Sequence, residues 1–124
     1  MGGAHARASE SRISTFPTPD EDDYCAKRGH CGPHNLRENR PGSFHSSELI
    51  FATYQNAGVR VFDIRNQFQP RQVAFHAPPA PEKMFDPRPA SQQQIQTCEV
   101  FVDRNGMLYA TDHNAGLYAL EYTG

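Results

Sequence analysis

Four side chains that can bind a transition metal lie in one short segment: Cys25, His30, Cys31 and His34. Cysteine thiolates and imidazoles are the usual protein ligands of zinc and copper. The spacing Cys-x4-His-Cys-x2-His differs from the common zinc patterns, and Gly32 and Pro33 exclude a helix that would place both histidines on one face. The segment is therefore a metal-site hypothesis, and the alternative is an incidental cluster in a loop.

The elements that would position these residues are β-strands, which begin only after residue 47. Residues 1–47 are polar and rich in Gly and Pro, which predicts an irregular, partly disordered segment with at most one short strand near 34–37. Residues 48–124 form the second unit. Runs of β-forming residues between turn residues predict strands over 49–54, 59–64, 72–76, 98–102, 107–111 and 117–122. The proline-rich stretch 77–96 predicts a loop.

An internal repeat is the strongest pattern in the chain. LIFATYQNAGVRVFDI (49–64) and MLYATDHNAGLYALEY (107–122) align without a gap, and each consists of a strand, an Asn-Ala-Gly turn and a return strand. Both faces of such a hairpin are apolar, so it needs neighbours on both sides. The repeat therefore predicts an all-β fold: an incomplete β-propeller of about two antiparallel blades, preceded by a largely irregular N-terminal segment.

The same residues resemble a known family. The pattern seen here as IFATYQNAGVRVFDI and LYATDHNAGLYALEY is similar to that of the LVIVD-repeat proteins, bacterial and archaeal proteins with a predicted propeller fold. The segment Cys31-Gly32-Pro33-His34-Asn35 and the PAPEKM stretch also resemble the C-terminal region of such proteins. The resemblance covers roughly residues 24–124 and implies that the chain corresponds to the C-terminal blades only. It implies a scaffold or binding role and carries no catalytic motif.

The repeat also suggests a specific site. In register, residues 33–36 match residues 97–100, and the innermost strands of a propeller line its central channel. We therefore hypothesise a zinc or copper site near the channel mouth, formed by His34, Cys98, His30, Cys31 and Glu99. The alternative reading is that Cys98 is a small buried residue and that His34 makes a hydrogen bond in a loop.

Composition excludes several classes of protein. The formal net charge is -2 and the basic residues are dispersed, which argues against nucleic-acid binding. No apolar run is long enough to span a membrane, and the chain starts without a signal peptide, so a cytoplasmic location is expected. Three cysteines form a poor disulfide framework; reduced thiols are expected, although one bridge can form.

Two functions remain after these exclusions. The first is a propeller-repeat binding or assembly module, a fragment or subunit of a larger β-propeller, whose partner is a protein or a second copy of the chain. The second is a metal-dependent, oxidative enzyme that uses the Cys/His site. No phosphate-binding loop and no nucleophile elbow occur in the sequence, so no catalytic residue is predicted and enzymatic activity stays an open question.

Overall fold

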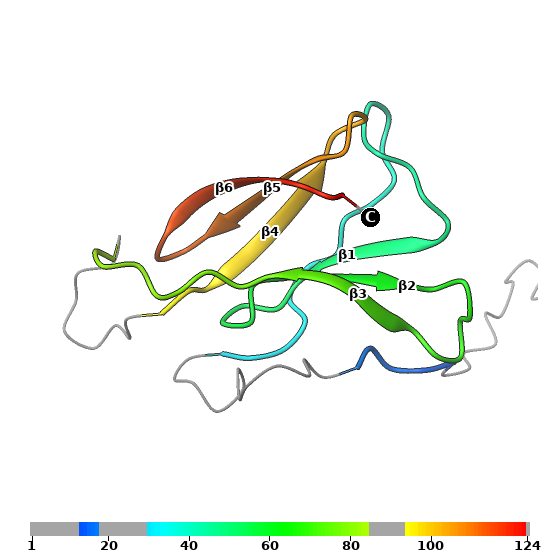
Figure 1. Ribbon diagram of the computed structural model, residues 1–124, viewed down its shortest axis with the longest axis horizontal. Helices are drawn as coiled ribbons and strands as arrows, with labels where there is room; N and C mark the ends of the chain where they lie inside the picture. The colour runs from blue at the N-terminus through cyan, green and yellow to red at the C-terminus, as the bar shows by residue number, and fades with distance from the viewer. Residues whose placement is uncertain (1–12, 18–29, 85–93, 124) are drawn as a thin grey trace, which may run out of the picture.

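The structure is a computed structural model that describes residues 13–17, 30–84 and 94–123. These residues are all-β, without a helix, which confirms the all-β part of the predicted fold (Figure 1). They form two antiparallel sheets of three strands each. Sheet 1 contains β1 (Leu49–Thr53), β2 (Val59–Asp63) and β3 (Arg71–His76). Sheet 2 contains β4 (Thr97–Val102), β5 (Met107–Asp112) and β6 (Gly116–Glu121).

The two copies of the repeat form matching hairpins, β1–β2 and β5–β6. Ile50 pairs with Phe62 in the first hairpin, and Leu108 pairs with Leu120 in the second. The glycine that ends each turn has a positive φ, 75° at Gly58 and 101° at Gly116. Glycine tolerates this backbone region at little steric cost, so the shared Asn-Ala-Gly sequence closes both hairpins.

Residues 34–37 lie along the free edge of β1. The amide of His34 donates to the carbonyl of Thr53 at 2.8 Å, and the amide of Arg37 donates to that of Phe51 at 2.9 Å. Leu36 and Ala52 form an isolated antiparallel bridge rather than part of a full strand. The short strand expected near 34–37 is thus reduced to a bridge that extends sheet 1 by one edge segment.

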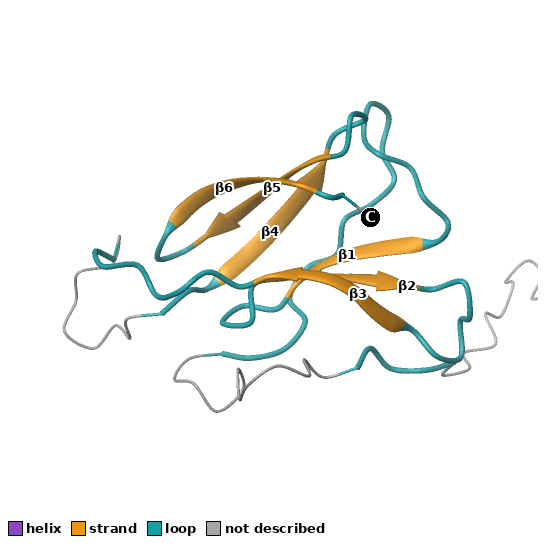
Figure 2. Ribbon diagram, viewed as in Figure 1, coloured by secondary structure: helices purple, strands orange, loops and turns teal. Residues whose placement is uncertain are grey.

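The core lies between the two sheets. Side chains alternate between the faces of a strand, so Phe51, Val59 and Val61 share one face of sheet 1. They pack against Val102, Leu108 and Ala110 of sheet 2. Figure 2 shows sheet 2 lying over one side of sheet 1. The two repeats therefore bury a common core, in which each sheet supplies the second layer for the other.

Residues 13–17 cover the opposite side of sheet 1, and we call them the N-terminal cap (blue in Figure 1). The ring of Phe16 stacks on that of Phe62 with centroids 4.8 Å apart. The Ser14 hydroxyl donates to the carbonyl of Gln67 at 2.7 Å. Each side of sheet 1 is thus in contact with another part of the chain.

Several predictions fall partly outside the described residues. The described parts of the N-terminal segment, 13–17 and 30–47, contain no helix or strand and only isolated bridges. Residues 77–84 of the predicted proline-rich loop also contain no strand, whereas residues 85–93 lie outside the described part. Cys25 also lies outside it. Over the residues that are described, no helix has the length and apolar character needed to cross a membrane.

Candidate functional site

The segments predicted to carry the metal site do meet in the structure. Glu99 pairs with Thr111 and Val100 with Ala110, whereas Leu36 pairs with Ala52, the repeat counterpart of Ala110. His34 and Cys98 therefore occupy matching positions beside consecutive hairpins, as the aligned repeats predict.

The contact between the two segments is centred on a backbone oxygen. The carbonyl of Cys98 accepts hydrogen bonds from Nδ1 of His34 at 3.1 Å, Nδ2 of Asn35 at 3.1 Å and Oγ1 of Thr53 at 2.7 Å. Cys98 is the additional residue of a β-bulge between Thr97 and Glu99. A bulged residue is released from the regular ladder, so its carbonyl is free to accept these donors.

The predicted ligand side chains point to other partners. The Cys98 thiol donates to the carbonyl of Gln96 at 2.9 Å, and a carboxylate oxygen of Glu99 accepts from Nδ2 of Asn35 at 2.5 Å. Burial raises the pKa of the Cys98 thiol, which disfavours the thiolate that a metal needs. In the part of the chain that the structure describes, no three His, Cys, Asp or Glu side chains form a group that could hold a metal ion.

Cys31 corrects the expectation of reduced thiols. It is disulfide-bonded, whereas Cys98 is a free cysteine. A disulfide sulfur is no thiolate donor, so Cys31 in this state does not contribute the ligand predicted for it. Reduced thiols were expected because the number of cysteines is odd. Composition does not show which two sulfurs lie close enough to form a bond.

The first Asn-Ala-Gly turn is held between two other segments. Gln55 forms isolated bridges with both Cys31 and Thr97, and the amide of Asn56 donates to the carbonyl of His30 at 3.1 Å. Gln55 has a φ of 54°, and it is the one non-glycine residue with positive φ in the described ranges. His30 and Cys31 therefore lie against this turn, and their role in the described structure is to fix its position.

A second feature of sheet 2 was not identified from the sequence: one of its faces is apolar and exposed. We call it the open face, and its apolar residues are Phe101, Tyr109, Leu117 and Ala119. Phe101 pairs with Tyr109, which pairs with Ala119, so three of them form a row across the sheet. Polar residues flank this row, as expected at the rim of a binding surface. These are Glu99, Thr111 and Glu121.

The repeat shows what a covered version of this face looks like. Tyr109 is 37% exposed and its counterpart Phe51 is 0% exposed; Leu117 is 66% exposed and its counterpart Val59 is 3% exposed. Phe51 and Val59 are buried because sheet 2 packs on them. The open face is therefore the repeat equivalent of an interface that is already filled on sheet 1. The aligned sequences contained this signal, but exposure could not be assigned before the packing was known.

The segment that follows the Leu36–Ala52 bridge forms a pocket at one end of the open face. A pocket of about 270 Å³ lies between residues 36–40 and β4–β5. Arg37, Glu38 and Arg40 line one wall, and Glu99, Phe101 and Tyr109 line the other. Charges of both signs surround the apolar side chains, so the pocket has no single charge preference.

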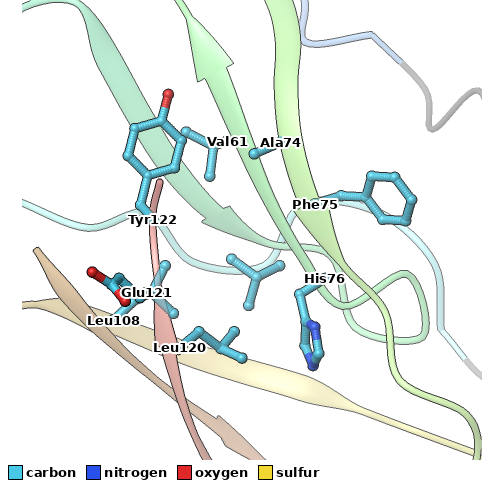
Figure 3. A pocket seen from close by; sticks show the side chains of 9 residues that line it. Val61, Ala74, Phe75, His76, Leu108, Leu120, Glu121 and Tyr122 are labelled. Atoms are coloured by element: carbon cyan, nitrogen blue, oxygen red, sulfur yellow. The ribbon is translucent and has the colours of Figure 1, made fainter. Parts of the chain in front are cut away.

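A smaller pocket lies at the edge of the core, where the two sheets meet (Figure 3). Its volume is about 60 Å³, far below the several hundred Å³ typical of ligand sites. Leu108, Leu120 and Tyr122 of the C-terminal repeat face Val61 and Ala74 across it, and the ring of Phe75 points away. This pocket is a packing gap in the core rather than a binding site.

Comparison of the chain with models of known protein families, with curated proteins and with solved structures finds no match. The class of protein is therefore defined by the fold alone: an all-β chain with two repeated antiparallel sheets that share one core.

Proposed function

We propose that this chain is a propeller-repeat binding or assembly module, a part of a larger β-propeller-like assembly, in which the open face of sheet 2 binds another β-sheet. The resemblance to LVIVD-repeat proteins agrees with this role. The observation that carries the proposal is the repeat equivalence of Leu117 with Val59 and of Tyr109 with Phe51, since each pair has one exposed and one buried member.

The chemistry of the partner follows from the interface inside the chain. On sheet 1, the equivalent face is covered by an antiparallel sheet that presents Val102, Leu108 and Ala110. Small and medium-sized aliphatic side chains of this kind allow two sheets to approach to about 10 Å. A partner sheet with the same alternation would bury the row formed by Phe101, Tyr109 and Ala119.

The experiment supplies a second sheet at high effective concentration. Two full-length copies are joined by a flexible Gly/Ser linker, so that each copy offers its sheets to the open face of the other. Linking converts binding into an intramolecular event, so even a weak contact is populated. We expect a slow population of β6 peptides in the joined chain that is absent from the single chain, because a sheet of one copy covers the open face of the other.

The matched controls use two equally exposed apolar residues. Leu117 is 66% exposed and Phe68 is 68% exposed, but only Leu117 lies on the open face. Leu117→Asp in both copies should abolish the slow population, and Phe68→Asp in both copies should keep it. Uniform fast exchange in the joined chain would contradict the proposal.

A further inference from the structure

The outer face of sheet 1 has the composition of a surface that packs on another sheet. We define this outer face as Ile50, Ala52, Phe62 and Ile64. In the repeat these residues correspond to Leu108, Ala110, Leu120 and Tyr122. All four of these counterparts belong to the side of sheet 2 that packs against sheet 1. The outer face of sheet 1 is thus the repeat equivalent of the surface that sheet 2 presents in the core.

Ala52 and Phe62 of this outer face are fully buried, with Phe16 of the N-terminal cap packed against them, whereas Ile50 and Ile64 are only partly buried. A groove of about 510 Å³ runs between the cap and the sheet, lined by Ile13, Phe16, Pro33, Ile50, Ile64 and Pro70. Ile13 is 51% exposed although it lies at this groove. The stack of Phe16 on Phe62 and the hydrogen bond from Ser14 to Gln67 hold the cap. A covering that leaves such a groove is weaker than the sheet-on-sheet packing in the core, because unfilled space loses dispersion contacts.

The open face of sheet 2 and the outer face of sheet 1 complement each other. The open face of sheet 2 is equivalent to the buried face of sheet 1, and the outer face of sheet 1 is equivalent to the buried face of sheet 2. Placing one on the other would reproduce, between two molecules, the contact that joins the two sheets within one molecule. Such a contact is heterologous, so it continues from copy to copy until the rotation closes a ring or a filament grows.

We propose that the open face of one copy binds the outer face of sheet 1 in a second copy, head to tail, and that the N-terminal cap competes for that outer face. This inference rests on the proposed function and names its partner as a second copy of this chain. The N-terminal cap then occupies the position that the neighbouring sheet would take, and displacement of the cap exposes the outer face of sheet 1.

The first experiment measures self-association of the full chain by sedimentation velocity over a wide range of concentration. Phe16→Ala removes the stacked ring of the cap and should tighten self-association by up to about tenfold, given the energy of an aromatic pair. Ile13→Asp places a charge at the groove and should act in the same direction; it serves as a second variant because Ile13 is half exposed. Phe68→Ala, outside both surfaces, should behave as the wild type. If both cap variants associate no more tightly than the wild type, the inference is wrong.

The second experiment tests the direction of the contact. A Phe16→Ala/Leu117→Asp chain keeps a free outer face but has a damaged open face. Mixed with Phe16→Ala chains, it should join at one end, stop growth and lower the mean assembly size. If it stays apart while Phe16→Ala chains pair, the contact joins two open faces and the head-to-tail inference fails. If the joined two-copy chain shows slowed exchange of β6 that Phe16→Ala leaves unchanged, the outer face under the cap is not the partner surface, so this inference fails and the proposed function stands.

Discussion

At the scale of single residues, Asp63 shows how a side chain at the end of a buried strand is stabilised. Its carboxylate accepts hydrogen bonds from the backbone amide of Arg65 at 2.9 Å and from Nε of Arg65 at 3.0 and 3.1 Å. The side-chain hydrogen bonds of Arg65, followed by its backbone amide, lower the pKa of Asp63 to about 2. The Asp63–Arg65 pair lies at the C-terminal end of β2, and its hydrogen bonds fix the chain where the strand ends.

This lowered pKa predicts a pH dependence of stability. The pKa of an aspartate in an unfolded chain is about 3.9. Below that pH, Asp63 therefore binds fewer protons in the folded chain than in the unfolded chain. Its contribution is fully present above about pH 4 and is lost as the pH falls through about 2. Asp63→Asn should therefore lower the free energy of unfolding at pH 7, and the difference from wild type should shrink toward pH 2.

Chemical denaturation at several pH values is the measurement. Glu38→Gln serves as the control because Glu38 pairs with Arg40 at 3.1 Å where both side chains are more than two-thirds exposed. Surface pairs of this kind contribute little to stability. A stability difference for Asp63→Asn that stayed constant down to pH 2 would refute the assigned role of the carboxylate.

The sequence predicted that His34 and Cys98 lie close together, but not which of their atoms are in contact. The aligned repeats indicated that the two residues occupy matching positions, and the strand register agrees. They did not indicate the bulge at Cys98, which turns a carbonyl rather than the thiol toward His34. A bulge depends on how two strands pair, so it has no reliable signature in one strand alone.

At the scale of elements, the β1–β2 and β4–β5 hairpins differ in how closely their turns approach the rest of the chain. Gly58 ends the first turn with a φ of 75°, and a Cβ added there would lie 2.1 Å from the carbonyl oxygen of His76, at the end of β3. Gly106, between β4 and β5, has a φ of 87° but nothing within 4 Å of the added Cβ. Backbone conformation is thus comparable at the two glycines, and only Gly58 has a steric constraint.

This difference gives a matched pair of substitutions. Gly106→Ala should lower the free energy of unfolding by about 1 kcal/mol, because alanine is strained in the left-handed backbone region. Gly58→Ala should cost about 3 kcal/mol or more, because β3 must also move away from the turn. Thermal or urea unfolding of the two variants measures both values. Equal losses would show that the approach of His76 does not constrain the turn.

At the scale of the whole molecule, two sheets of three strands share one core. Within the described residues, each sheet forms the second layer of the other, and the short N-terminal cap also packs on sheet 1. A two-stranded or three-stranded sheet needs such packing for independent stability. We therefore expect both sheets to unfold together.

Leu108→Ala tests this coupling. Leu108 belongs to β5 and is 3% exposed in the shared core, so the substitution should cost about 2–5 kcal/mol. Amide exchange should accelerate by the same factor in β2 of sheet 1 as in β5 of sheet 2. Leu36→Ala, at an exposed leucine outside the core, should change stability by less than about 0.5 kcal/mol. Faster exchange in sheet 2 alone would show that the sheets are independent.

The sequence by itself determined the strands, the turns and the repeat. Each of the six strands lies within about one residue of its predicted position, because β-forming residues, their alternation and turn residues are local properties. It also determined that both faces of each hairpin are apolar.

Only the tertiary structure decided which of those faces is covered. Val59 and Leu117 are matching residues in the repeat, yet one is buried and the other exposed. Their difference depends on whether a second sheet lies above them, and that is a property of packing between distant segments. The same holds for the cap on Phe62 and for the disulfide state of Cys31. Local patterns specify elements, but exposure is specified by what the elements pack against.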